Sequence, residues 1–146
     1  MKKLIIYLSA TETMENHALE TYPEECCGFL YGTEGDVREI SHAGKTKNIK
    51  SENKRKKFKI DPLEYLRAEK YAMANKLELL GIYHSHPDHP AVPSEHDREN
   101  AAGYFSYIIV SVGKNKINNI RSWQLNDQRE FDEEKILESK HMKVNT

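Results

Sequence analysis

The chain has 146 residues, of which 38% are hydrophobic and 31% are charged, and its formal net charge is −1. This length suits one domain with one hydrophobic core, and the near-neutral charge argues against a nucleic-acid partner, because such proteins usually carry a clear basic excess. No apolar run approaches the roughly 18 residues of a membrane span, and the apolar run after Lys2 and Lys3 is too short for a signal peptide, which predicts a cytoplasmic protein.

The first third of the chain predicts three strands and one helix. Residues 4–8 are apolar and β-prone, which is typical of a short strand. Residues 11–21 contain helix formers and stop before Pro23, whose ring disfavours a helical conformation in the preceding residue. The apolar runs at 26–32 and 37–41 predict an antiparallel pair of strands joined by a turn that contains glycine.

A basic stretch follows at residues 45–59, where eight lysine or arginine residues accompany one acid. We interpret it as an exposed loop that ends in a short strand at 58–60. Asp61 and Pro62 are a helix start signal, because aspartate caps a first turn and proline fits the first helical position. The helix is expected to reach about residue 76. Its apolar residues recur at helical spacing and predict an apolar stripe formed by Leu63, Leu66, Tyr71, Ala74 and Leu77.

The second half of the chain predicts three further strands and one short helix. The strands cover residues 79–83, 106–112 and 117–125. The first of them leads to His84, and after a loop at 85–93 Ser94 is the expected N-cap of the helix. The last twenty residues are polar and predict a short element at about 131–137, with fraying beyond it.

These elements predict a single α/β (α+β) domain over residues 1–146, in which a central mixed β-sheet is flanked by helices. Its core is expected at about residues 4–125, followed by a polar C-terminal tail. Cys26 and Cys27 are the two cysteines of the chain. Because neighbouring cysteines rarely bridge each other, we expect no disulfide and a reducing compartment.

The chemistry is concentrated in the His-Ser-His-Pro segment at residues 84–87. Residues two apart at the end of a strand project to the same side, so His84 and His86 can bind one ion together, and imidazole nitrogen suits zinc. Asp97, on the first turn of the next helix, is the candidate third ligand, which leaves a fourth position open as in catalytic zinc sites. The alternative is purely structural: strand-end histidines are often core or surface residues, and Ser94 with Asp97 has the spacing of a capping box.

Together these residues resemble the signature of the JAMM (MPN+) metalloprotease family, in which His-x-His-Pro precedes Ser-x-x-Asp. That family also has an upstream Glu-x-Cys-Gly, and Glu25 heads such a sequence at residues 25–28. The resemblance covers roughly residues 4–125 and implies a fold related to the cytidine deaminases. It implies one Zn²⁺ per chain and assigns a role to five residues. His84, His86 and Asp97 would be the metal ligands. Glu25 would be the proton shuttle, and Ser94 would steady the oxyanion.

The resemblance also implies a substrate class. It predicts hydrolysis of a peptide or isopeptide bond after the C-terminal Gly-Gly of a ubiquitin-like or sulfur-carrier protein. The basic stretch at 45–59 is then either a solvated face or a surface for that partner. Asp88, His89 and His96 are competing candidates in the same segment, to which the resemblance gives no role, and Cys27 is expected to pack in the core.

Three other functions are weaker. A non-catalytic interaction module of the MPN type would not need the intact set of five residues. A DNA-repair-associated relative would carry a helical DNA-binding region, for which the chain has no room. A zinc deaminase would carry Pro-Cys-x-x-Cys, which is absent. The sequence leaves the oligomeric state open, a homodimer included.

Overall fold

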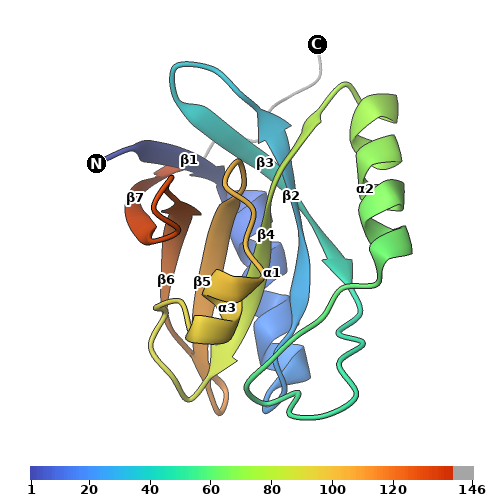
Figure 1. The fold of residues 1–146 in the computed structure, drawn as a ribbon, viewed down its shortest axis with the longest axis vertical. Helices are drawn as coiled ribbons and strands as arrows, with labels where there is room; N and C mark the ends of the chain where they lie inside the picture. Colours follow the sequence, from blue (N-terminus) through green and yellow to red (C-terminus); the bar gives the residue numbers. More distant parts are fainter. Residues whose placement is uncertain (140–146) are drawn as a thin grey trace.

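Seven strands of residues 1–139, which are the part of the chain that the structure describes, form one mixed sheet closed into a barrel (Figure 1). The structure is a computed structural model. In chain order its elements are β1 (Lys3–Tyr7), α1 (Leu8–Thr21), β2 (Cys27–Thr33), β3 (Arg38–Thr46), α2 (Pro62–Ala74), β4 (Glu78–Pro87), α3 (Glu95–Glu99), β5 (Ser106–Gly113), β6 (Lys116–Leu125) and β7 (Phe131–Ser139). The fraying expected at the end of the chain falls on residues 140–146, outside the described residues. Within 1–139, every helix is too short or too polar for a membrane span.

The strand order around the barrel is β1-β3-β2-β4-β5-β6-β7. The pairs β1–β3, β1–β7 and β4–β5 are parallel, and the other pairs are antiparallel. The prediction of an α+β fold with a mixed sheet and helices is therefore confirmed. The central strands β4 and β5 run side by side, so a side chain at the end of β4 lies over a well-supported part of the sheet (Figure 1).

The two longer helices cover opposite faces of the sheet. Side chains of a strand alternate between faces, and in β2 Leu30 packs into the same cluster as α1, whereas its neighbours Phe29 and Tyr31 pack with α2. Both Cys26 and Cys27 are buried and free, as predicted. The α1 side forms the main core, and the α2 side carries the strand-end residues that the sequence singled out.

The N-cap of α2 is confirmed, but the two leucines that begin its predicted apolar stripe do not face the core. The Asp61 carboxylate accepts a hydrogen bond from the backbone N–H of Leu63 at 3.0 Å. Leu63 and Leu66 are nevertheless 59% and 53% exposed, while Ala68 and Ala72 are buried. Small side chains let the helix lie close to the sheet, so the contact face is defined by alanines and the larger leucines point away from it.

Two predictions around the basic stretch need correction. β3 extends to Thr46 rather than residue 41, because it pairs with β2 along the whole length of that strand. Residues 58–60 form no strand. The backbone there meets the other arm of its own loop, with a hydrogen bond from Ile49 N–H to the Lys59 carbonyl at 2.9 Å, instead of a sheet edge.

The predicted short element near the C-terminus is a nine-residue strand, β7, which pairs with both β6 and β1. The C-terminal limit of the core, expected at about residue 125, is therefore too early. The charged residues that made this segment look like a tail are paired across the sheet: Glu133 contacts Arg121 at 2.7 Å, and buried Glu134 accepts from the Ser122 hydroxyl at 2.9 Å.

A buried polar contact joins α1 to β4. Tyr83 is fully buried, and its hydroxyl lies 2.7 Å from Nδ1 of His17. Burial, with a smaller effect of the nearby Lys45 charge, lowers the pKa of His17 to about 4. This histidine is therefore neutral at neutral pH.

Candidate metal centre

Three side-chain atoms meet in a small triangle at the end of β4. His84 Nε2 and His86 Nε2 are 3.2 Å apart, and Asp97 Oδ2 lies 3.2 Å from the first and 3.1 Å from the second. Ligands held about 2.0–2.1 Å from a tetrahedral zinc ion are separated by about 3.3–3.4 Å. The three atoms thus have nearly the spacing that one bound ion would impose.

The histidines lie within β4, which continues through residues predicted as a loop. The strand reaches Pro87 because it remains paired with β5, where His84 faces Ile109 and His86 faces Ser111. Their positions two residues apart put both rings on one face of the sheet, as the sequence predicts.

Asp97 belongs to the capping box of α3, and its Oδ2 takes part both in that capping box and in the triangle with the histidines. Ser94 Oγ accepts from the Asp97 N–H at 3.1 Å, and Asp97 Oδ2 accepts from the Ser94 N–H at 2.9 Å. Oδ2 is also the atom that contacts both histidines. The helix cap and the triangle therefore coexist, and the cap fixes the carboxylate that faces the rings.

The rings of His84 and His86 are held in different ways. His86 Nδ1 lies 2.9 Å from the Pro90 carbonyl, which can only accept, so Nδ1 carries a proton and Nε2 is the ring nitrogen that faces the triangle. His84 Nδ1 is buried and has no hydrogen-bond partner among the described residues. The ring of Phe58 stacks on His84 instead, with centroids 4.5 Å apart and planes at 27°.

Phe58 is a site residue that sequence reasoning missed. It was assigned to a strand, and no local pattern marks an aromatic residue that reaches a histidine 26 positions later. The contact arises only because the loop at 47–59 folds back over the end of β4.

The proline-rich loop after β4 is rigidly held. Three consecutive carbonyls accept hydrogen bonds from side chains of three different strands, β4, β5 and β6. The pairs are Ser111 with His89, His86 with Pro90, and Trp123 with Ala91. This loop leads directly to Ser94, so α3 and Asp97 are presented from a fixed support.

Glu25 completes the cluster from the segment just before β2. Its side chain is 2% exposed, Oε1 has no partner among the described residues, and one carboxylate oxygen lies within 4.8 Å of ligand atoms of His84 and His86. Burial, reinforced by the negative charge of Asp97, raises the pKa of Glu25 to about 9.

Asp97 has the opposite electrostatic behaviour. Burial alone would raise its pKa, but the charge of His84 and hydrogen bonds from both histidines and from Ser94 N–H hold the pKa well below its usual range. Burial lowers the pKa of His84, against the attraction of Asp97, which raises it. Two carboxyl groups beside one triangle therefore differ: Asp97 is ionised, and Glu25 holds a proton at neutral pH.

Two cavities flank the triangle. One is lined by Glu25, His86 and Ser94 together with Lys56, His89, Pro90 and Val92. The other has an apolar and aromatic wall from Phe58, Ile60, Tyr65, Ile82 and Tyr107, with Lys50, Lys59, His96 and Asn100 at its polar edge. Three lysines of the basic stretch therefore face the cavities. An extended chain crossing from one cavity to the other would pass over the triangle.

The three competing candidates lie outside the triangle. His89 lines one cavity and His96 the other. Asp88 accepts a hydrogen bond from the Tyr22 hydroxyl at 2.8 Å. Cys27 packs in the α2-side core, as predicted, and burial raises the pKa of its thiol to about 12, which makes a thiolate role unfavourable.

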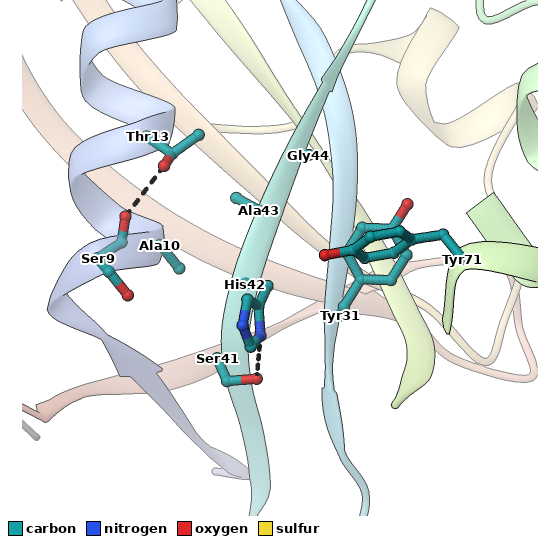
Figure 2. A pocket seen from close by; sticks show the side chains of 9 residues that line it. All are labelled: Ser9, Ala10, Thr13, Tyr31, Ser41, His42, Ala43, Gly44 and Tyr71. Carbon is teal, nitrogen blue, oxygen red and sulfur yellow. Dashed lines mark hydrogen bonds between the residues drawn. The ribbon is translucent and has the colours of Figure 1, made fainter. Parts of the chain in front are cut away.

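A further hollow lies between α1 and β3 (Figure 2). Its walls include Ser9 and Thr13 of α1, His42 of β3, and the rings of Tyr31 and Tyr71, whose centroids are 4.8 Å apart. It contains one histidine, whose Nδ1 is occupied by the Ser41 hydroxyl at 2.8 Å, and no carboxylate. This hollow therefore offers no cluster of metal-ligating side chains like the one at the end of β4.

Comparison with known proteins gives a family match, sequence relatives and a similar solved structure. Residues 9–126 match the Prok-JAB family, described as prokaryotic homologs of the JAB domain. The chain is 32% identical to the desampylase of Pyrococcus furiosus over 113 residues, which are 77% of this chain and 75% of that protein. It is 31% identical to the CysO-cysteine peptidase of Mycobacterium tuberculosis over 126 residues, 85% of this chain and 84% of the relative. The solution structure of protein DSY2949 from Desulfitobacterium hafniense aligns with a TM-score of 0.84 at 30% identity, covering 96% and 95% of the two chains.

Proposed function

This chain belongs to the prokaryotic JAB domain family, and from that premise we propose that it is a zinc-dependent metallopeptidase. Its substrate would be a ubiquitin-like or sulfur-carrier protein, cut at the peptide or isopeptide bond that follows a C-terminal Gly-Gly. The observation that carries the proposal is the triangle of His84, His86 and Asp97 with buried Glu25 beside it. Relatives named as a desampylase and as a CysO-cysteine peptidase support the substrate class.

We propose that His84, His86 and Asp97 hold one Zn²⁺ per chain. Two imidazole nitrogens and a carboxylate at mutual distances of 3.1–3.2 Å are a donor set that zinc accepts, and three protein ligands leave a fourth position open. When bound, zinc supplies Lewis-acid polarisation of a carbonyl group and a strongly lowered pKa for a coordinated water molecule. Asp97 suits the ligand role because it is ionised and because its Oδ2 already lies 3.1–3.2 Å from Nε2 of both histidines.

Glu25 is the proposed proton carrier of the reaction. Its carboxyl group is buried next to the triangle and has an oxygen that no described residue occupies. A positive charge in the triangle favours the ionised form of Glu25, which can then accept a proton from the attacking water. The protonated form can deliver that proton to the leaving amine. A positioned acid–base group of this kind contributes about two to four orders of magnitude in rate.

Ser94 is the proposed oxyanion donor. Its oxygen accepts the capping hydrogen bond from Asp97 N–H, and no described acceptor is paired with its hydroxyl hydrogen. That hydrogen can therefore point into the cavity that Ser94 shares with Glu25 and His86. A donor aimed at the developing negative charge of a tetrahedral intermediate is worth about 3 kcal/mol.

The cavities on either side of the triangle suit an extended substrate tail. Glycine residues present no side chain, so a Gly-Gly segment can approach the triangle closely while its flanking residues occupy the cavities. The basic residues Lys50, Lys56 and Lys59 at these cavities would face the body of the carrier.

Intact-mass spectrometry of ubiquitin-like carriers, each extended beyond Gly-Gly by a short peptide, tests the proposal. Zinc-loaded protein should remove the extension, and neither the Glu25→Ala variant nor chelator-treated protein should do so. Undiminished cleavage by the Glu25→Ala variant would remove Glu25 from the mechanism. A lack of cleavage of every carrier and conjugate by protein that holds one equivalent of zinc would refute the proposed activity.

A further inference from the structure

The loop at 47–59 holds both backbone polar groups of Glu25. The Glu25 N–H donates to the Lys54 carbonyl at 2.6 Å, and the Glu25 carbonyl accepts from the side-chain amide of Asn48 at 3.1 Å. Glu25 lies two residues before β2, and both hydrogen bonds of its own backbone groups go to the loop rather than to the sheet. The segment that sequence reasoning treats as a solvated basic stretch is thus a support of the buried carboxyl group.

Asn48 lies at the centre of this support, and every hydrogen-bonding position of its side chain is used. Nδ2 donates to the carbonyls of Glu25 and Lys57, both at 3.1 Å. Oδ1 accepts from the N–H groups of Lys50 at 3.0 Å and Lys59 at 3.1 Å. A primary amide has two donor hydrogens and two acceptor lone pairs, so these four bonds satisfy it completely.

Two of the four bonds fix the residue that supports a proposed ligand. The Lys57 carbonyl and the Lys59 N–H lie on either side of Phe58, whose ring stacks on His84. A metal-binding histidine is usually oriented by a hydrogen bond from its second ring nitrogen. His84 Nδ1 has no such partner in the described part of the chain, so its ring is held by the stacked Phe58 ring and by the contact of Nε2 with Asp97.

We infer that Asn48 is a positioning residue that aligns Glu25 and His84 with each other. One amide bonds to the backbone of the proton carrier and to both backbone neighbours of Phe58. A shift of the loop would move the carboxyl group and the stacked ring together. The catalytic part of this inference rests on the proposed function, whereas its structural part concerns the metal-free chain and stands by itself.

Asn48→Asp is the sharpest variant, because it keeps the shape and the acceptor oxygen but places a second oxygen against the carbonyls of Glu25 and Lys57. The matched control is Asn126→Asp. Asn126 organises the turn between β6 and β7 in a similar way, with Oδ1 accepting from the N–H groups of Gln128 and Glu130. Both variants lose an asparagine at the hub of a loop, but only the first loop touches the proposed site.

The first measurement is hydrogen exchange of the metal-free protein, followed by peptide mass spectrometry. We expect Asn48→Asp to exchange at least about tenfold faster in peptides covering residues 23–27 and 57–60, while the β6–β7 turn stays unchanged. Asn126→Asp keeps both of its bonds to backbone N–H groups, so residues 23–27 and 57–60 should stay as protected in this variant as in the wild type. Equal protection of 23–27 in wild type and Asn48→Asp would overturn the inference, whatever the enzyme does.

The second measurement is steady-state cleavage by the zinc-loaded protein of a carrier that the wild type cuts. We expect Asn48→Asp to lower kcat by about 10- to 100-fold with KM within about twofold, and Asn126→Asp to leave kcat unchanged. An unchanged kcat in Asn48→Asp would overturn the inference and leave the proposed function intact. A wild type inactive on every carrier would refute the proposed function, and the exchange pattern would still decide whether Asn48 holds Glu25.

Folding is checked by thermal melting of Asn48→Asp, Asn48→Ser and Asn48→Ala. Cooperative melting with a kcat that falls in parallel in all three supports the positioning role. Loss of cooperative melting in all three would make Asn48 a general folding residue and overturn the inference.

Discussion

Replacing Asp97 by asparagine should abolish the response of the protein to zinc while leaving the fold in place. The substitution removes the one negative charge that touches both His84 Nε2 and His86 Nε2, at 3.2 and 3.1 Å. It keeps an oxygen that can accept from the Ser94 N–H, so the cap of α3 survives. The effect of the change is therefore confined to the triangle.

The magnitude follows from binding linkage. Zinc at 100 times its dissociation constant stabilises the wild type by about 2.7 kcal/mol. With an unfolding entropy of about 2.1 cal/mol/K per residue, a chain of 146 residues should gain about 9 °C in Tm. If the variant binds zinc about 100-fold more weakly, the same concentration equals its dissociation constant, and the gain falls to about 0.4 kcal/mol, or about 1 °C.

The assay is thermal melting of metal-free protein with and without added zinc chloride, together with zinc content after gel filtration. Asp61→Asn is the matched control, because it changes the N-cap aspartate of α2 in the same way, and it should keep the full 9 °C shift within about 2 °C. If zinc raised the Tm of Asp97→Asn as much as that of the wild type, and the variant kept one equivalent of zinc, the assignment of Asp97 as a ligand would be refuted.

Three further outcomes are expected. Phe58→Ala, which removes the ring stacked on His84, should weaken zinc binding about tenfold in competition with a chromogenic chelator, and Phe58→Tyr should not; equal affinities would contradict the supporting role of the ring. Because the pKa of His17 is lowered to about 4 in the folded state, the free energy of unfolding should decrease as pH falls from about 6.5 towards 4. Urea melts of His17→Gln should show a smaller decrease over the same pH range. Identical decreases in the two proteins would refute the lowered pKa of His17. On α2, Leu66→Glu should lower the free energy of unfolding by less than about 0.5 kcal/mol in urea melts, whereas Ala68→Leu should lower it by about 1–3 kcal/mol. The reverse order would show that the leucines, as expected from the sequence, form the packing face of the helix.

Local signals in the sequence predicted the parts of the fold that local chemistry determines. Asp61 before Pro62 located the start of α2, and Ser94 with Asp97 located the cap of α3, because capping depends on residues within one turn. The spacing of His84 and His86 placed both rings on one face because strand alternation is a property of the backbone. The geometry of the triangle was predictable to that extent.

Contacts between distant segments were not predictable in this way. The stacking of Phe58 on His84 and the four bonds of Asn48 join residues across loops, and no periodicity records them. The leucines of α2 match a helical stripe but face away from the sheet, since periodicity alone cannot say which side of a helix packs when small residues offer closer contact. The pKa difference between Glu25 and Asp97 likewise depends on burial that only the assembled fold creates.

The position of β1 between β3 and β7 has a consequence for the order in which the molecule is made. β1 is synthesised before every other strand of the barrel, yet one of its two neighbours, β7, is formed by residues 131–139. Closing the barrel requires a contact between segments more than 120 residues apart, whose loop-closure entropy makes such pairings late and slow. A nascent chain stalled before residue 131 would therefore expose one edge of β1 and the outer edge of β6. Those edges would then be open to pairing with other chains until synthesis resumed.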